Sequence, residues 1–427
     1  MEQNLHDRLR RLGLTRSPQQ ARQQSRRKGK PIEELIAGEL VHTGSGPFFL
    51  FRERYPLDHL HGQEQLSALL AHVPRGPSLL ARDDRLAAVD LQRIAFVDTE
   101  TTGLAGGTGT YAFLVGVGVF REEGFVLYQF FMRDYAEESA QLEALGELLD
   151  DMEAVVSFNG KSFDLPLLES RFIMARQQPR LVDVPHLDLL PAARRLWKYR
   201  LASCALSSLE DEVLAVRRTQ ADVPGWLIPG LYADYARTGD AQEMPGIFYH
   251  NAQDILSLVT LTARMCDLLD ARRSLSSDLP GEDLYGLGRL FNDLGEADGA
   301  EKAFVRAAQS SRARWVRERA MQDLAYLLKR QERRGEALPW WEELARSAGA
   351  LNAYEELAKH YEWHAGDLDQ ALSWTREAID LVRQWPRGAK RRAALVELEH
   401  RMARLDLKLA GQAEADPATA GAVEDED

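Results

Sequence analysis

The 427-residue sequence contains only two cysteines, no long apolar run and no excess of basic side chains. Cys204 and Cys266 cannot form a disulfide framework, and the first 30 residues lack the apolar stretch of a secretory signal. The longest clearly apolar stretch, residues 112–120, is far shorter than the roughly 18–20 residues that cross a bilayer. We therefore expect a cytoplasmic protein without a membrane partner.

The net charge of -13 argues against a protein held on nucleic acid by bulk positive charge. The charge is unevenly distributed, however. Residues 1–30 contain nine basic and two acidic side chains, whereas residues 411–427 contain six acids and no base. We expect a basic, disordered lead-in at residues 1–30 and an acidic, disordered tail at residues 411–427.

The apolar pattern of residues 91–275 is typical of a mixed sheet covered by helices. Short runs rich in β-branched and aromatic residues predict four strands, at residues 94–97, 112–120, 124–132 and 154–158. Apolar residues at helical spacing predict one helix, at residues 137–151, before the last strand. The second and third strands are expected to form a hairpin. Residues 31–90 are expected to form a small lead-in segment with some β-structure.

A helical repeat follows the α/β region. Apolar and small residues at helical spacing, including Leu287 and Gly288, recur 37 residues later at Leu324 and Ala325, and a third copy gives Leu357 and Ala358. This pattern looks like three tetratricopeptide-like repeats closed by a final helix, although an unrelated helical bundle is the alternative. We expect residues 281–410 to form this repeat domain and to offer a surface for a protein partner.

Asp98 and Glu100 end the first predicted strand in an Asp-x-Glu pattern. Side chains alternate along a strand, so both carboxylates point to the same side. Two like charges this close repel each other, and a divalent metal ion between them relieves the repulsion. Such pairs also occur as solvated residues at strand edges, so the pair alone does not establish a metal site.

Two further acids lie in segments that begin or form helices. Asp164 stands at an expected helix start with Pro166 in the first turn, where its carboxylate can face the end of the first strand. The apolar period of residues 248–269 predicts a single helix, which places His250 and Asp254 on one face, one turn apart. A helix cap or a surface pair is the alternative explanation for these residues.

Together these segments resemble the DEDD superfamily of 3′–5′ exonucleases, which have a ribonuclease H-like fold. Residues 98–104 resemble its first motif, Asn159 with Phe163 and Asp164 matches the second, and Asp254 with an upstream His or aromatic residue matches the third. The wider sequence looks like the YprB-like bacterial group, in which tetratricopeptide repeats follow the nuclease domain. The resemblance covers the α/β domain well and the repeats less closely.

The third motif departs from the superfamily pattern. Members carry either Tyr four residues before the last Asp or His five residues before it, whereas here His250 is four residues before Asp254 and Tyr249 is five before it. The general base is therefore either His250 or Tyr249. Helical geometry and a pKa near 6.5 favour the histidine.

The resemblance implies hydrolysis of a phosphodiester with two bound metal ions. Asp98, Glu100, Asp164 and Asp254 would hold two Mg²⁺ or Mn²⁺ ions, because hard cations prefer oxygen ligands. These four acids and His250 are the expected catalytic residues.

Thr101, Asn159 and Lys161 are the expected contacts to the substrate, although Asn159 equally suits a structural turn. Basic residues around Trp197 and Tyr199 combine charge with aromatic rings, as single-stranded nucleic acids prefer, but a solvated helix face with a packed tryptophan fits them as well.

The sequence therefore predicts a ribonuclease H-like α/β domain followed by an all-α tetratricopeptide-like domain. The expected function is a metal-dependent 3′–5′ exonuclease that acts on single-stranded DNA or RNA. The alternative is a weak or inactive nucleic-acid-binding scaffold whose repeats recruit a protein partner.

Overall fold

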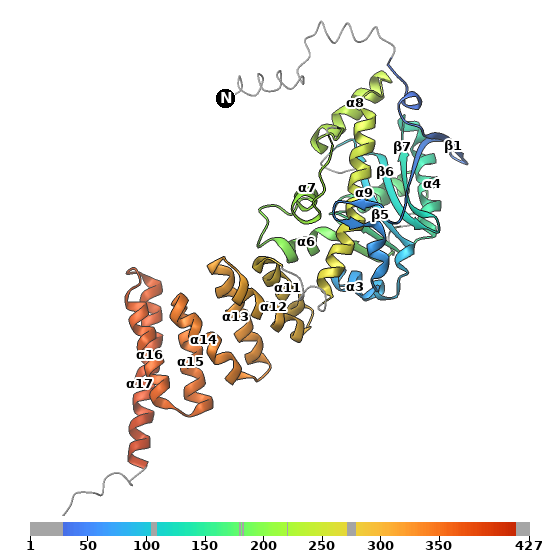
Figure 1. Cartoon of the computed structure of the whole chain (residues 1–427). Coiled ribbons are helices and arrows are strands. Elements are labelled where there is room, and N and C mark those ends of the chain that lie inside the picture. Colours follow the sequence, from blue (N-terminus) through green and yellow to red (C-terminus); the bar gives the residue numbers. More distant parts are fainter. Residues whose placement is uncertain are drawn as a thin grey trace, which may run out of the picture. The chain divides into compact units, whose positions relative to one another are not determined.

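The computed structural model describes residues 29–103, 109–178, 181, 183–219, 221–270 and 279–415 (Figure 1). The chain divides into two compact units, the first comprising Met1–Arg194 with Leu201–Asp270 and the second Arg195–Arg200 with Ala271–Asp427. Across the described ranges, no helix combines the length and apolarity needed to cross a membrane. Residues 1–28 of the expected basic lead-in and residues 416–427 of the expected acidic tail lie outside the described residues.

The first unit is built on one seven-stranded mixed sheet with the strand order β1-β2-β7-β6-β5-β8-β9. The strands are β1 (Glu39–Thr43), β2 (Gly46–Tyr55), β5 (Ile94–Thr101), β6 (Ala112–Arg121), β7 (Gly124–Phe131), β8 (Ala154–Ser157) and β9 (His186–Asp188). β8 runs parallel to β5 and β9 runs parallel to β8, whereas the other neighbours are antiparallel. The four predicted strands are confirmed, and β6 and β7 form the predicted hairpin.

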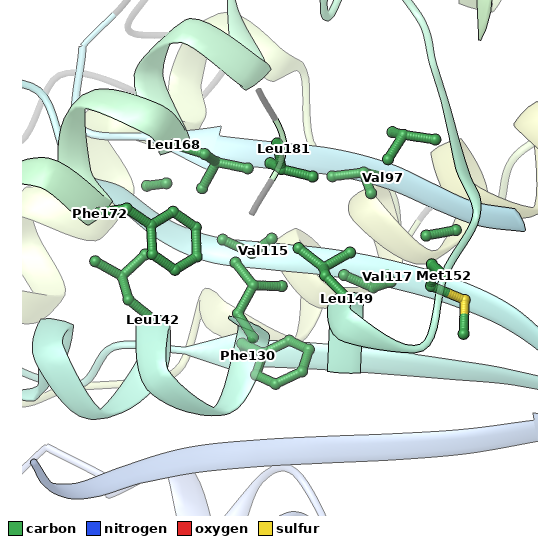
Figure 2. Close-up of a cluster of buried hydrophobic side chains, with 14 of the residues drawn as sticks. Val97, Val115, Val117, Phe130, Leu142, Leu149, Met152, Leu168, Phe172 and Leu181 are labelled. Atoms are coloured by element: carbon green, nitrogen blue, oxygen red, sulfur yellow. The ribbon is translucent and has the colours of Figure 1, made fainter. Parts of the chain in front are cut away.

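Helices α4 (Glu138–Asp150) and α5 (Asp164–Met174) cover one face of this sheet. Figure 2 shows Leu142 and Leu149 of α4 beside Val115 and Phe130 of the hairpin, all of them buried. Each large apolar side chain buried in this way contributes about 1.5–3 kcal/mol to folding. The helix predicted at residues 137–151 is therefore α4, and its apolar side forms the core on this face.

Helices α8 (Ile228–Thr238) and α9 (Met244–Leu269) cover the opposite face. The rings of Phe131 and Phe248 pack with centroids 5.2 Å apart, and the buried hydroxyl of Tyr232 donates a hydrogen bond of 3.0 Å to the Met132 carbonyl. The helix predicted from residue 248 is confirmed and begins one turn earlier. It is the element that carries His250 and Asp254 to the sheet.

The expected lead-in at residues 31–90 is not separate from this sheet. β2 pairs antiparallel with β7, with Phe49 opposite Phe131, and β1 adds the edge strand next to β2. Phe48 and Phe49 are fully buried, one in each core. The α/β fold therefore extends toward the N-terminus beyond the predicted boundary at residue 91.

Shorter elements connect these layers. They are η1 (Ile32–Glu34), β3 (Leu60–His61), β4 (Glu64–Gln65), η2 (Leu66–Ala71), α3 (Arg75–Ala81), η3 (Asp84–Ala88), η4 (Leu91–Arg93), η5 (Tyr135–Glu137), α6 (Leu189–Trp197), α7 (Leu206–Leu209), η6 (Glu210–Leu214) and η7 (Gly225–Leu227). η6 is a π-helix turn and η7 is a turn of 3₁₀-helix. Both lie close to the site described below.

The second unit consists of helices, each packed against the next. They are α11 (Gly281–Asp293), α12 (Ala297–Ser310), α13 (Arg314–Arg330), α14 (Arg334–Ala348), α15 (Leu351–His360), η8 (Tyr361–Ala365), α16 (Leu368–Arg383) and α17 (Ala389–Ala415). The small residues of the predicted repeat allow close approach, since a Cβ atom on Gly288 would lie 2.7 Å from the Phe304 ring. α17 continues to Ala415, so the first five residues of the expected tail are helical.

Candidate active site

Asp98 and Glu100 lie near the end of β5, on the face of the sheet that α9 covers. Side chains alternate along the strand, so Ala95 and Val97 enter the core beneath α4 and the two acids point the other way. The pairing register with β6 shifts between Glu100 and Thr101. Such irregularities re-aim side chains at strand ends. The predicted same-side arrangement of the two acids follows from this strand geometry.

A buried amide on α9 fixes the Asp98 carboxylate. The Nδ2 of Asn251 donates hydrogen bonds of 2.8 Å to Oδ2 and 3.3 Å to the main-chain oxygen of Asp98. The Oδ1 of Asn251 accepts a 2.8 Å bond from Gln129 on β7. Gly116 leaves room for this amide, because a Cβ there would lie 2.2 Å from it. The sequence analysis missed Asn251 and Gln129, although a glutamine inside an otherwise apolar strand is a signal.

Asp164 is the first residue of α5, as predicted, and approaches the end of β5 from the turn after β8. The Thr99 hydroxyl, which lies between the two acids of β5 in sequence, donates a hydrogen bond to Asp164 Oδ1. Gly160 in the preceding turn lies close by, since a Cβ there would be 3.3 Å from Asp164 Oδ2. The strand end therefore binds this carboxylate directly.

Asp254 and His250 occupy one face of α9, as the helical spacing predicted. The Nε2 atom of His250 lies 3.7 Å from Asp254 Oδ2 and 4.0 Å from Glu100 Oε1. α9 thus places one imidazole nitrogen between acids that come from two different elements.

The acids are close enough to shift one another's titration. Burial, followed by the charges of Asp254 and Asp164, raises the pKa of Asp98 well above its usual range. Burial, followed by Asp98, Asp254 and Asp164, does the same to the pKa of Glu100. The four carboxylates that the sequence singled out therefore form one electrostatic cluster.

Asp164 is shifted less than the two β5 acids. Burial raises its pKa to about 6, with smaller contributions from Asp188 and Asp254, while the hydrogen bond from Thr99 opposes the shift. Like-charge repulsion and desolvation together make the ionised form of this acid costly. A cation bound at the cluster would offset that cost.

Arg218 supplies a positive charge at this cluster that the sequence analysis did not predict. Its Nη2 forms an ion pair with Asp254, while its Nε and Nη2 form bonds of 2.8 and 2.6 Å with the buried Glu210 of η6. Glu210 is held in turn by a 2.6 Å bond from Ser257 of α9. The pairing joins residues 36 apart in sequence, and no local pattern marks it.

His250 and Tyr249 face different surroundings. The Nδ1 of His250 lies 2.7 Å from Asp222 Oδ1, which leaves Nε2 toward the acids. The Tyr249 hydroxyl instead accepts a 3.0 Å hydrogen bond from the Thr219 main-chain N–H. Of the two candidate bases, only His250 is directed at the carboxylate cluster.

The three expected substrate contacts have structural partners. Asn159 adopts a positive φ of 65°, and the N–H groups of Asn159 and Lys161 donate bonds of 2.7 and 3.2 Å to the buried Asp188. Asn159 therefore shapes the turn before α5. Lys161 contributes only its main-chain N–H to that turn, and its side chain is exposed. The Thr101 hydroxyl donates a 2.8 Å bond to the Gly103 carbonyl.

The donor set suits a hard divalent cation. All four acids offer oxygen ligands. The raised pKa values of Asp98 and Glu100 reflect burial first and then neighbouring negative charge, which a cation would neutralise. Among the described residues, no group of three or more His, Cys, Asp or Glu side chains is already arranged to hold a metal ion. Arg218 pairs with Asp254, one of these acids.

Two comparisons with known proteins bear on this site. Residues 95–266 match the sequence profile of the ribonuclease H superfamily, a range that includes all four acids and His250. The chain is 33% identical over 342 residues to the uncharacterized protein YprB of Bacillus subtilis (strain 168). The matched region covers 78% of this chain and 80% of that protein.

Proposed function

Because the chain belongs to the ribonuclease H superfamily, in the family of YprB, we propose that it is a metal-dependent 3′–5′ exonuclease of single-stranded DNA or RNA. The observation that carries the proposal is the convergence of Asp98, Glu100, Asp164 and Asp254 in one electrostatic cluster. The Nε2 atom of His250 lies 4.0 Å from Glu100 and 3.7 Å from Asp254 of this cluster. These residues come from three elements that are far apart in sequence, and their charges act on one another. A carboxylate cluster of this kind is costly unless it binds cations.

Asp98, Glu100, Asp164 and Asp254 would hold the two Mg²⁺ or Mn²⁺ ions of the proposed site. When bound, such ions make water a better nucleophile and stabilise the oxygen that leaves phosphorus. Asn251 keeps Asp98 in place, and Thr99 keeps Asp164 in place.

His250 is the proposed general base. Nδ1 lies 2.7 Å from Asp222 Oδ1 and 3.2 Å from Arg218 Nη1. In the tautomer with the proton on Nδ1, Asp222 accepts its hydrogen bond and the lone pair of Nε2 is available toward the acids. Arg218 Nη1 lies 3.6 Å from the same Asp222 oxygen and shares this carboxylate. His250 would take a proton from the attacking water as the new P–O bond forms and the bond to the 3′ oxygen breaks. The products are a nucleoside 5′-monophosphate and a strand shortened by one residue.

The helices of residues 281–410 are proposed to be tetratricopeptide-like repeats that bind a protein partner. The repeated apolar positions Leu287, Leu324 and Leu357 are all buried, and successive helices pack in pairs. The cytoplasm is the proposed location.

The test is the cleavage of single strands labelled at either end, with Mn²⁺ or Mg²⁺ and with EDTA. The proposal predicts stepwise shortening from the 3′ end, loss of activity in EDTA and loss of activity in Asp98→Asn. The matched control is Asp58→Asn, which removes an exposed carboxylate outside the cluster and is expected to cleave as the wild type does. Shortening from the 5′ end would contradict the polarity, and equal cleavage by Asp98→Asn would contradict the site.

A further inference from the structure

Two large aromatic side chains are exposed beside the carboxylate cluster. Trp226 is 63% exposed and Phe163 is 53% exposed. Scattered exposed apolar residues are common on proteins and need no explanation. These two stand out by position, because each is one residue away from a residue that contacts or belongs to the cluster.

Trp226 follows Gly225, which lies against His250. A Cβ atom on Gly225 would be 3.7 Å from His250 Nε2, the nitrogen that faces the acids. The loop of residues 221–227 is fixed at two further points. Asp222 bonds to His250 at 2.7 Å, and Val223 packs so closely on Gly246 that a Cβ there would lie 2.8 Å away. The indole is therefore held on a fixed backbone at the mouth of the site.

Phe163 precedes Asp164 directly, at the start of α5. The turn that carries it is fixed by Asp188, which accepts hydrogen bonds from Asn159 and Lys161. Both aromatic rings thus project from backbones that the structure holds in place. A side chain on a fixed backbone loses less conformational freedom when a ligand stacks on it than one on a mobile loop.

Exposed basic residues occur in the segments that carry or precede the two aromatic residues. Lys161, two residues before Phe163, is exposed. Arg217 lies in the chain that leads to the Trp226 loop, and its side chain is 90% exposed, with Asp211 4.0 Å away. Positive charge interleaved with aromatic rings is the combination that binds unpaired nucleic acid, since the cations attract phosphates and the rings stack on bases. By contrast Trp197, the ring that the sequence suggested for this role, is only 1% exposed.

We propose that Trp226, next to the residue that lies against His250, and Phe163, next to Asp164, stack on unpaired bases, so that the site accepts a single strand and rejects a duplex. This inference rests on the proposed nuclease function and adds the residues that select the substrate. Paired bases are stacked on their neighbours and cannot reach either ring without being separated, at a cost of a few kcal/mol per step. Stacking is tolerant of base identity, so the preference is for strandedness rather than for sequence.

Binding in EDTA tests this inference without requiring cleavage. The full chain is titrated into a fluorescein-labelled 12-nucleotide single strand, and separately into a blunt duplex of the same length. We expect Trp226→Ala to bind the single strand roughly 5- to 100-fold more weakly than the wild type, and Trp226→Phe to recover most of the affinity. Trp315→Ala, which removes an exposed tryptophan of the second unit, is the matched control and should bind as the wild type does.

The emission of the indole provides a second readout. A base stacked on Trp226 should quench part of the tryptophan emission when strand is added, and Trp226→Phe should bind the strand without that part of the quenching. Equal affinity in Trp226→Ala, an equal loss in Trp315→Ala, undiminished quenching in Trp226→Phe, or a wild-type chain that binds duplex as well as single strand would each overturn the inference. Binding through Trp226 with no cleavage in Mn²⁺ would instead contradict the proposed function alone.

Discussion

Asn251 is a single buried side chain that connects three parts of the site. It joins Gln129 of β7 to Asp98 of β5 and is itself fully buried on α9. Removing it takes the amide partner from the buried Asp98 carboxylate and leaves the Gln129 amide bonded to the Phe248 carbonyl. An unpaired buried polar group costs about 1–3 kcal/mol. The amide therefore contributes both to stability and to the position of Asp98.

We predict that Asn251→Ala lowers the free energy of unfolding by about 1–3 kcal/mol and reduces the rate of strand cleavage. The first effect is measured by urea unfolding and the second by initial rates in Mn²⁺. In a double-mutant cycle with Gln129→Leu the two losses should not add, because the residues share one hydrogen bond. Additive losses would contradict the coupling.

Asp164 should make the free energy of unfolding fall as pH rises, whereas a salt-bridged acid with a lowered pKa makes it rise. Its pKa is about 6 in the folded chain, against a reference value of 3.8, so between these values the native state binds more protons than the unfolded state. Stability without metal should therefore fall as pH rises from about 4 to 6 and stay at its lower level above that. Asp164→Asn should reduce this slope, as measured by urea unfolding in EDTA at stepped pH, and a slope equal to that of the wild type would contradict the assignment.

The roles of single residues were predictable where the signal is local. Asp98 and Glu100 share a strand, and His250 and Asp254 share a helix, so periodicity alone places each pair on one side. Arg218 and Asp222 were not predictable, because they reach α9 from an irregular segment whose path depends on tertiary packing.

At the scale of elements, the strands with strong apolar runs and the long helix α9 were predicted from composition and period. The placement of β1 and β2 in the sheet was not predicted. β2 pairs with β7 about 80 residues later, and the sequence of a strand does not specify which strand it pairs with. The consequence for function is modest, since β5, α5 and α9 alone carry the four acids.

Helix α17 is held to the rest of its unit by a buried carboxylate as well as by apolar contacts. The side chain of Glu362 in η8 is 0% exposed and lies 3.3, 2.8 and 2.7 Å from cationic nitrogens of Arg401, Arg404 and Lys408. Leu405 adds an apolar contact to Leu368 and Leu372. The ion pairs and the leucine lie on the same side of the helix.

We predict that Glu362→Gln destabilises the packing of α17 by about 1–3 kcal/mol, because three cations lose their charged partner while remaining partly solvated. Limited proteolysis should then cut earlier within residues 389–415. Glu397→Gln, which changes an exposed acid on the same helix, is the control. Equal protection in both variants would show that apolar packing alone holds the helix.

At the scale of the whole molecule, the net charge of -13 is a poor guide to the substrate. Four of the acids form the candidate metal cluster and six lie beyond residue 410, whereas exposed cations stand near the site itself at Arg217 and Lys161. Local charge at the site, rather than the total, decides what the protein attracts.

Metal binding should be visible in the stability of the whole chain. A ligand that binds only the folded state at one hundred times its dissociation constant stabilises it by about 2.7 kcal/mol. We therefore predict that Mn²⁺ raises the Tm of the wild type, that EDTA reverses the rise, and that Asp98→Asn abolishes it. Asp58→Asn should show the full rise, and an unchanged Tm in the wild type would contradict binding at the cluster.

The central claim is that four acids from three elements act as one hydrolytic site. The most direct measurement compares the cleavage of a labelled single strand in Mn²⁺ by Asp98→Asn, Glu100→Gln, Asp164→Asn and Asp254→Asn, each checked for folding by its Tm. The account predicts that every one of these folded variants cleaves at least about 100-fold more slowly than the wild type. Any one of them that folds and cleaves at the wild-type rate would contradict it.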